Sequence, residues 1–270
     1  AFVQQWAGPQ DAQVQAYIAH LAPKRRTLAV DVLARYPTLE SLIADPELGR
    51  MLAVEAFPKH EPMAAEKTQR LIQPRDVAVT VWLGIHVYAF EHFCATRGPV
   101  GADTPWFRTI GMVKGLTPSE VDVFASAHLH GPLHPHVEND FSGFDSTVTP
   151  AASDWMIDNL WRPMFGDGFA TLYRSAQYSS TRLGRGLMKL PGQRRSGDVT
   201  TSVENGILNS LVTARAVDVV NAGRVARGDA AVEARMLIEG DDSIASLSHA
   251  LSDQDCAAFG AAAARLGFRC

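Results

Sequence analysis

The sequence predicts an α+β fold in which helices fill the first half and short strands join them in the second. Residues 11–56 carry apolar side chains at helical intervals, punctuated by Pro23, Pro37 and Pro58. From Pro135 onward, short strands are expected to alternate with helices. The chain has 270 residues, of which 46% are hydrophobic, so it can bury a core as one large domain or two smaller ones.

Two helices have clear sequence signals. A long buried helix is expected after Asp76, because residues 77–90 contain no charged side chain. That stretch is too short to span a membrane, so the sequence predicts no membrane segment in this chain. A second helix should begin at Pro118, with Thr117 as its cap and Glu120 completing a capping box.

The charge and cysteine content exclude some classes of protein. The net charge of −4 argues against a protein that binds polyanions over its whole surface, so any contact with nucleic acid would be local. Three widely separated cysteines indicate reduced thiols rather than a disulfide framework. The chain begins without Met and ends within a helical pattern, which indicates that it is part of a longer protein; its start shows no secretory signal.

Positive charge gathers in residues 22–27, 57–75 and 181–195. A single basic run is more often a solvated face than a binding site, but three of them favour local binding of a polyanion. The last run contains no acidic residue, and its glycines and proline predict an irregular, exposed path. Its basic residues are Arg182, Arg185, Lys189, Arg194 and Arg195.

Two adjacent aspartates, Asp241 and Asp242, lie between two apolar runs in the stretch "RMLIEGDDSIASL". Neighbouring carboxylates repel one another, and where water is scarce this costs stability unless a cation neutralises them. Gly240 permits a tight turn, so the stretch predicts two strands with the acidic pair at their connection. We therefore expect a cation at this tip.

A second acidic element, "DFSGFD", carries Asp140 and Asp145 five residues apart. This spacing brings the two carboxylates into one site only if the chain bends between them, as Ser142 and Gly143 allow. Thr149 and Pro150 then predict a helix that runs to about residue 165.

A third element, "SGDVTTSVEN", begins with a flexible turn at Ser196 and Gly197. After it, apolar residues recur every four positions, as on a buried helix face; they are Val199, Val203, Ile207 and Leu211. Thr201 and Asn205 are also four apart and share a face, where they could bind a ligand or each other.

In this order, "DFSGFD", "SGDVTTSVEN" and "GDD" resemble motifs A, B and C of the RNA-dependent RNA polymerases of positive-strand RNA viruses. "FPKHEPMAAEKTQRLIQPR" resembles their motif F, and with the later "KGLTP" it is most similar to the tombusvirus-like group. The resemblance covers roughly residues 57–268. It implies a right-hand polymerase palm, a ferredoxin-like antiparallel sheet backed by helices, with a helical part of the fingers and no thumb. Residues 1–134 would be the fingers portion and residues 135–270 the palm, up to the start of motif D.

The resemblance also implies a role for each site residue. Asp140, Asp241 and Asp242 would hold two Mg²⁺ ions, which Mn²⁺ can replace, for nucleotidyl transfer. Asp145 and Asn205 would recognise the ribose. Residues that position the template and the incoming nucleotide would be Ser196, Gly197 and Thr201, and those that line the nucleotide entry channel would be Lys59, Lys67 and Arg70. Arg75 is expected in a structural ion pair.

The partners implied are an RNA template and product and ribonucleoside triphosphates, in a viral replication complex in the host cytoplasm; the oligomeric state stays open. Reverse transcriptases share the two-metal chemistry, but Asp145 and Gly240 depart from their motifs. The remaining alternatives are an incomplete polymerase and a non-catalytic RNA-binding module with a calcium site. A zinc site at His128, His130, His134 and His136 is not expected, because prolines interrupt the segment and no cysteine is near.

Overall fold

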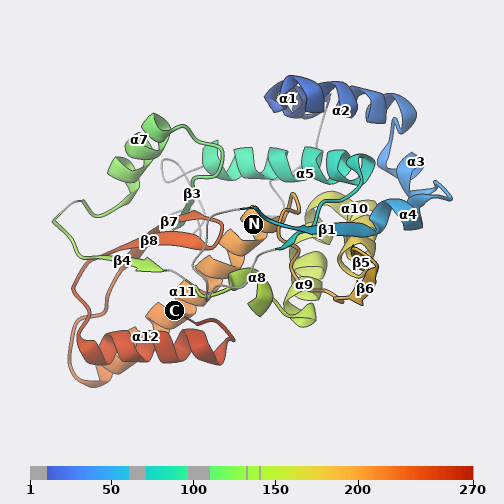
Figure 1. Cartoon of the computed structure of the whole chain (residues 1–270). Coiled ribbons are helices and arrows are strands. Elements are labelled where there is room, and N and C mark those ends of the chain that lie inside the picture. The colour runs from blue at the N-terminus through green and yellow to red at the C-terminus, as the bar shows by residue number, and fades with distance from the viewer. Residues whose placement is uncertain (1–10, 61–70, 97–109, 132, 140, 270) are drawn as a thin grey trace. The chain divides into compact units, whose positions relative to one another are not determined.

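The structure is a computed structural model that describes residues 11–60, 71–96, 110–131, 133–139 and 141–269 (Figure 1). It contains helices and two small mixed sheets, which confirms the expected α+β class. The chain forms two compact units, each built from two segments: Ala1–Ala89 with Val148–Thr201, and Phe90–Thr147 with Ser202–Cys270. The fingers and palm boundary expected near residue 134 is a different division and stays a prediction.

Helices open the first unit, as the periodicity predicts. Pro23 stands at the start of the second helix, where its missing N–H costs nothing. Arg26 in the same helix donates to the carbonyl oxygens of Ile18, Ala19 and Leu21 and so satisfies the end of the preceding helix. The four helices are α1 (Asp11–His20), α2 (Pro23–Arg35), α3 (Leu39–Ile43) and α4 (Leu48–Leu52).

The long helix expected after Asp76 is α5 (Val77–Thr96). Asp76 Oδ1 accepts a hydrogen bond of 2.8 Å from the amide of Ala78 and thereby caps its first turn. By length and composition, the Val77–Ala95 stretch could cross a membrane. The expectation of no membrane segment rested on residues 77–90, which are shorter. However, 61% of the most apolar window of the longer stretch is buried within the protein, as in a core helix.

The helix expected from Pro150 begins there, and Thr149 Oγ1 accepts from the Ala152 amide. It continues beyond the expected end at residue 165, with a kink at Gly166, whose φ is +83°. Trp161 and Phe169 are completely buried and form ring contacts with each other. The three helical segments are α9 (Pro150–Met156), the π-helical turn η2 (Ile157–Trp161) and α10 (Arg162–Gln177).

The sequence also predicts core packing, rather than base stacking, for two other tryptophans, Trp106 and Trp155, because that is the commoner fate of such residues. Trp155 is 48% exposed, so that expectation is wrong for this residue. The other, Trp106, lies outside the described residues.

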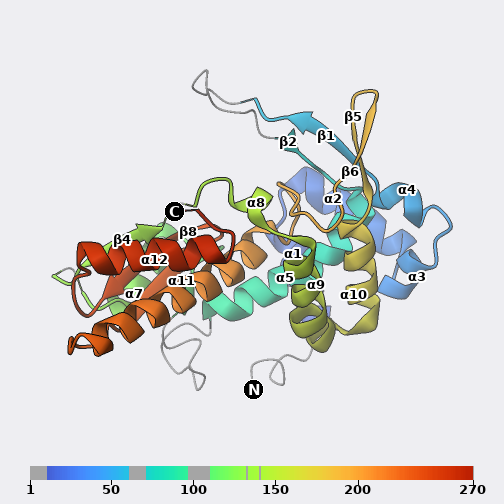
Figure 2. The same cartoon turned by 90° about the horizontal axis from the view of Figure 1, so that it is seen from below.

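The first unit also contains a sheet of order β2-β1-β5-β6, which Figure 2 shows from below. The basic run that was expected to be irregular contains the β5–β6 hairpin, which joins this sheet because β5 pairs in parallel with β1. The strands are β1 (Val54–Pro58), β2 (Leu71–Ile72), β5 (Ser180–Leu183) and β6 (Gly186–Lys189).

The second unit is built on a sheet of order β3-β7-β8-β4. Strands β7, β8 and β4 are antiparallel, as expected, but β3 pairs in parallel with β7, so the sheet is mixed rather than wholly antiparallel. Its buried core includes Ile110, Met236, Ile238 and Leu247. The strands are β3 (Ile110–Met112), β4 (His136–Asn139), β7 (Ala234–Glu239) and β8 (Asp242–Leu247).

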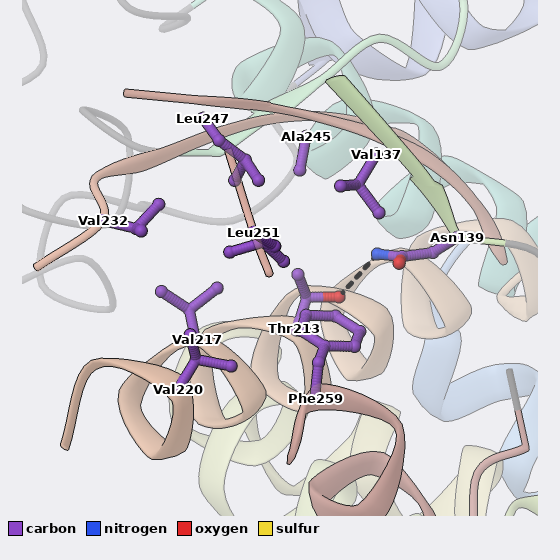
Figure 3. Close-up of a pocket in the computed structure, with 10 residues that line it drawn as sticks. All are labelled: Val137, Asn139, Thr213, Val217, Val220, Val232, Ala245, Leu247, Leu251 and Phe259. Atoms are coloured by element: carbon purple, nitrogen blue, oxygen red, sulfur yellow. Dashed lines mark hydrogen bonds between the residues drawn. The ribbon is translucent and has the colours of Figure 1, made fainter. Parts of the chain in front are cut away.

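Helices of the second unit pack on this sheet. Side chains of α11, α12 and the sheet meet around a small apolar cavity of about 10 Å³, roughly the space that one water needs (Figure 3). The capping box at Thr117 and Glu120 forms as predicted. The helices are α7 (Pro118–His128), α8 (Phe144–Thr147), α11 (Thr201–Ala226) and α12 (Asp253–Arg265).

Candidate active site

The acidic pair lies at the tip of the β7–β8 hairpin, which confirms the predicted arrangement of strand, turn and strand. Glu239 and Asp242 are paired across the two strands, leaving Gly240 and Asp241 as the two-residue turn. Gly240 has a φ of +69°, whereas no described residue other than glycine has a positive φ. This pattern of φ signs is that of a type II′ turn, which requires glycine in the first central position. Asp241 is thus held at the tip and Asp242 begins β8.

Asp241 and Asp242 are exposed, contrary to the expectation that the pair lies where water is scarce, yet the charge of Asp241 is still disfavoured. The pKa of its carboxyl group is raised, first because the surrounding chain partly shields it from water and then because Asp145 and Asp242 add negative charge. Hydrogen bonds from its own backbone amide and from Asn205 act in the opposite direction. The site therefore favours a proton or a cation at this carboxylate.

The structure brings together the predicted pair of Asp145 and Asn205. Asn205 Nδ2 on α11 donates a hydrogen bond of 2.7 Å to Asp145 Oδ1 on α8. The bend expected before Asp145 is present at Ser142 and Gly143, and Asp145 lies in the short helix that follows this turn. Asn205 is only 1% exposed, and its Oδ1 is buried with no hydrogen-bond partner among the described residues. This oxygen is free to accept a hydrogen bond from a ligand.

A residue that the sequence reasoning missed, Asn209, contacts the same hairpin. Its Nδ2 donates a hydrogen bond of 2.8 Å to the backbone carbonyl oxygen of Asp241. The helix approaches the sheet closely here, because a Cβ atom at Gly206 would lie 3.2 Å from the end of Met112 and 3.4 Å from Ile238. The signal that could have revealed Asn209 is its spacing, four residues after Asn205 on the same helix.

The Ser196–Gly197 turn belongs to the first unit. Its backbone is held by a hydrogen bond of 3.1 Å from the Gln73 amide to the Ser196 carbonyl, and Gly197 has a φ of +90°. Thr201 at the start of α11 donates from its hydroxyl to the Arg195 carbonyl oxygen at 2.8 Å. The structure thus gives Thr201 a role in holding this loop.

The apolar stripe expected after this turn is only partly correct. Val203 and Ile207 are buried in α11, but Leu211 is 37% exposed and Val199 precedes the helix. The buried side chains at the start of α11 are both apolar and polar, and the polar ones include Asn205 and Asn209.

Arg75 forms the structural ion pair that was expected for it. Its Nη2 lies 2.7 Å from Asp198 Oδ2, and both side chains are only 1% exposed. Arg75 also donates to the Ala176 carbonyl oxygen at 2.8 Å, and Asp198 accepts from the Val199 amide at 3.0 Å. The pair therefore ties the segment after β2 to the loop before α11.

Two arginines of the basic run are buried, contrary to the expectation of an exposed path. Arg194 is 3% and Arg195 1% exposed. Arg195 donates to the carbonyl oxygens of Gln177 and Ser179 and to the Thr181 hydroxyl, so it holds the end of α10 against β5. Burial, with the nearby positive charge of Arg75, lowers its pKa to about 10. The exposed cations of this run are Arg182, Arg185 and Lys189.

Three predicted site residues lie outside the described residues: Asp140, Lys67 and Arg70. Lys59 follows β1 and is half-buried. Within the second unit the structure thus places Asp145, Asn205, Asp241 and Asp242, and it describes Asn139, the residue immediately before Asp140.

The carboxylates fit a hard divalent cation. Asp241 and Asp242 supply oxygen ligands from adjacent residues, and a cation would offset the negative charge that Asp145 and Asp242 add at Asp241. In the part of the chain that the structure describes, no three His, Cys, Asp or Glu residues form a metal-binding group, and Asp140 is not in that part. His128, one of the clustered histidines, is buried, with its Nε2 3.1 Å from the Met236 carbonyl oxygen.

Comparison with known proteins gives one family. The family model for viral RNA-dependent RNA polymerases matches residues 39–270, which include every predicted site residue. None of the curated proteins compared with the chain matches it.

Proposed function

The chain belongs to the viral RNA-dependent RNA polymerase family, and we propose that it performs template-directed RNA synthesis for viral genome replication and transcription. The observation that supports this most is that one helix holds both acidic segments. On α11, Asn205 binds the Asp145 carboxylate and Asn209 binds the carbonyl oxygen of Asp241. Residues four apart share a helix face, so a single rigid element orients both segments toward one site.

The proposed metal ligands are Asp140, Asp241 and Asp242. Two bound Mg²⁺ ions, which Mn²⁺ can replace, would activate the attacking 3′-hydroxyl group and stabilise the leaving pyrophosphate. The protein supplies carboxylates in a fixed place, since Asp241 and Asp242 are anchored in a two-residue turn between paired strands. A cation would be favoured there because the Asp241 carboxylate is partly shielded from water and lies near the negative charges of Asp145 and Asp242.

We assign nucleotide and template contacts to residues of the first unit. Lys59, Lys67 and Arg70 would contact the triphosphate, where a guanidinium group can bind two phosphate oxygens at once. Ser196, Gly197 and Thr201 would position the template and the incoming nucleotide. By the likeness of their motifs, we place the protein in the tombusvirus-like group, acting in a replication complex in the host cytoplasm.

The ribose would be recognised by Asp145 and Asn205. The 2′-hydroxyl has one hydrogen, which the Asp145 carboxylate or the buried Asn205 Oδ1, unpaired among the described residues, could accept, and the Asn205 NH₂ group could donate to the hydroxyl oxygen. A deoxyribonucleotide would leave such a buried group unsatisfied, which costs roughly 1–3 kcal/mol.

We therefore expect Asn205→Ala to reduce the preference for ribonucleotides over deoxyribonucleotides by about 5- to 150-fold, mainly by slowing ribonucleotide incorporation. The measurement is kcat/KM for single-nucleotide incorporation with each sugar.

Asn221→Ala is the matched control, because Asn221 lies on the same helix but binds the backbone of Val232. It should leave the sugar preference unchanged. Equal losses with both sugars in Asn205→Ala would show that Asn205 supports the fold and that the ribose is recognised elsewhere.

The exposed cations of the β5–β6 hairpin are proposed to contact RNA phosphates. Replacing Arg182, Arg185 and Lys189 with Gln should make the dependence of RNA affinity on salt less steep. The slope of log K against log salt should fall by about 2, because each lost phosphate contact removes about 0.7 with single-stranded RNA.

Arg162→Gln serves as the control for this charge change, since Arg162 is already paired with Asp158 and Asp167. Titrations at several salt concentrations measure both slopes. An unchanged slope in the triple variant would assign the hairpin to the solvated surface.

A further inference from the structure

A closed network of polar side chains, three buried and one half-buried, connects the acidic hairpin to β4 and α11. It joins Asn139 at the end of β4, Asn209 and Thr213 on α11, and Ser243 on β8. Asn209 and Thr213 are completely buried and Asn139 is 5% exposed. Polar groups in such surroundings are costly unless each has a partner, so a complete network specifies one arrangement of the elements that carry it.

The hydrogen bonds in this network run from Asn139 as the first donor to Asn209 as the last acceptor. Asn139 Nδ2 donates to the hydroxyl oxygens of Thr213 and Ser243, at 3.1 and 3.3 Å (Figure 3 shows the bond to Thr213). Both hydroxyls then donate to Asn209 Oδ1, at 3.2 and 3.3 Å. With its oxygen accepting two hydrogen bonds, Asn209 must present its NH₂ group on the opposite side.

The NH₂ group of Asn209 contacts the turn between β7 and β8. Asn209 Nδ2 is 2.8 Å from the carbonyl oxygen of Asp241 and 3.5 Å from that of Gly240. The Asp241 carbonyl belongs to the peptide unit that joins the two aspartates. Glu239 and Asp242 are the last pair of β7 and β8 before the turn. The Asp241 carbonyl oxygen lies in the turn, outside the hydrogen bonds between the strands, and accepts its hydrogen bond from the Asn209 side chain.

We propose that Asn209 is a positioning residue that fixes the peptide between Asp241 and Asp242, so that a divalent cation meets the two carboxylates in one preset arrangement. Thr213 and Ser243 orient Asn209, and Asn139 orients them in turn. The same network therefore connects the acidic turn to the end of β4, one residue before Asp140 in the sequence. The cation is the one that the proposed function requires, but the fixing of the turn does not depend on catalysis.

Two measurements on the chain test this inference, neither of which requires activity. Hydrogen exchange of the amides of residues 240–243 reports whether the turn is held, and Mn²⁺ titration followed by electron paramagnetic resonance reports affinity for the cation. In Asn209→Leu, these amides should exchange at least about 5-fold faster, since a hydrogen bond to the turn is lost. Mn²⁺ affinity should fall by about 10- to 100-fold, as is typical when a group that orients a ligand is removed.

A less disruptive variant tests the inference if Asn209→Leu does not fold. Thr213→Val removes one hydroxyl that orients Asn209 and keeps the shape of the side chain. It should weaken Mn²⁺ binding in the same direction by about 2- to 10-fold. Ser210→Ala is the matched control, because the buried Ser210 hydroxyl donates only to the Ile207 carbonyl oxygen of its own helix, at 2.6 Å. It should change neither measurement.

The outcomes separate this inference from the proposed function. If Asn209 were only structural, its replacement would lower the melting temperature and leave Mn²⁺ affinity and exchange at the turn like those of Ser210→Ala, and the inference would be wrong. If the turn loosens and Mn²⁺ binding weakens in Asn209→Leu but the wild-type protein makes no RNA, then the proposed function fails and the positioning role stands.

Discussion

Asp241→Asn is expected to abolish measurable RNA synthesis and, at the same time, to make the metal-free protein more stable. Asparagine keeps the shape of the turn but supplies a weaker metal ligand. Replacing groups that merely orient metal ligands costs about 10- to 100-fold, so the loss of a ligand should reduce incorporation by at least about 100-fold. Nucleotide incorporation and thermal unfolding of the same preparation test both expectations.

The sign of the stability change follows from the raised pKa of Asp241. A carboxyl group whose pKa is higher in the folded state favours folding while it is protonated, and this contribution is lost as pH rises through the folded-state pKa. At pH 7 without metal, the neutral asparagine should therefore raise the melting temperature. Below about pH 4, where the aspartate is itself neutral, the two proteins should melt alike.

The control is Asp218→Asn, since Asp218 is an exposed carboxylate on α11. This change should affect neither activity nor the melting temperature in a pH-dependent way. Incorporation by Asp241→Asn at the wild-type rate would remove Asp241 from the catalytic assignment. A lower melting temperature at pH 7 would mean that its charge is already compensated in the metal-free protein.

Asp198→Ala is expected to destabilise the protein by about 3–5 kcal/mol. The change leaves the Arg75 guanidinium buried without its carboxylate, and breaking a buried ion pair from one side has this typical cost. The nearby positive charge of Arg195, which is also buried, adds repulsion. Urea unfolding, monitored by circular dichroism, measures the change in the free energy of unfolding.

Two further variants are compared with Asp198→Ala, one in an exposed ion pair and one in which both members of the buried pair are replaced. Glu47→Ala breaks the exposed pair with Arg50 and should cost less than about 1 kcal/mol. Replacing both Arg75 with Met and Asp198 with Leu should recover part of the loss, because the Arg75 charge is then removed together with its carboxylate, while Arg195 still loses the attraction of Asp198. A cost for Asp198→Ala as small as that for Glu47→Ala would show that water reaches Arg75.

Local signals in the sequence predicted several elements correctly. The apolar run after Asp76 indicated α5, and Thr117 with Glu120 indicated the capped start of α7. The hairpin at Gly240 was predictable because a two-residue turn between apolar runs needs glycine there. In each case the information lies within a few neighbouring residues.

Other features depend on residues far apart in the sequence and could not be predicted from local patterns. Strand β3 pairs in parallel with β7 through residues more than a hundred positions away. Arg195 is buried because the fold brings carbonyl oxygens of Gln177 and Ser179 to its guanidinium group. In the same way, Asn209 has a role only because α11 lies against the acidic turn.

The pairing of Asp145 with Asn205 lies between these cases. The resemblance of the motifs implied that the two residues act together, and the structure joins them by a hydrogen bond of 2.7 Å. Their role in recognising ribose stays a prediction, as do the metal-binding roles of Asp140, Asp241 and Asp242.

A single-nucleotide extension assay tests most directly whether the protein synthesises RNA on a template. An RNA template and primer are supplied with each ribonucleoside triphosphate in turn, with Mg²⁺ or with a chelator. We predict that only the nucleotide complementary to the template is added, that addition requires the metal, and that Asp241→Asn eliminates it. RNA binding without templated addition at any Mg²⁺ or Mn²⁺ concentration would contradict the account and identify a non-catalytic RNA-binding protein.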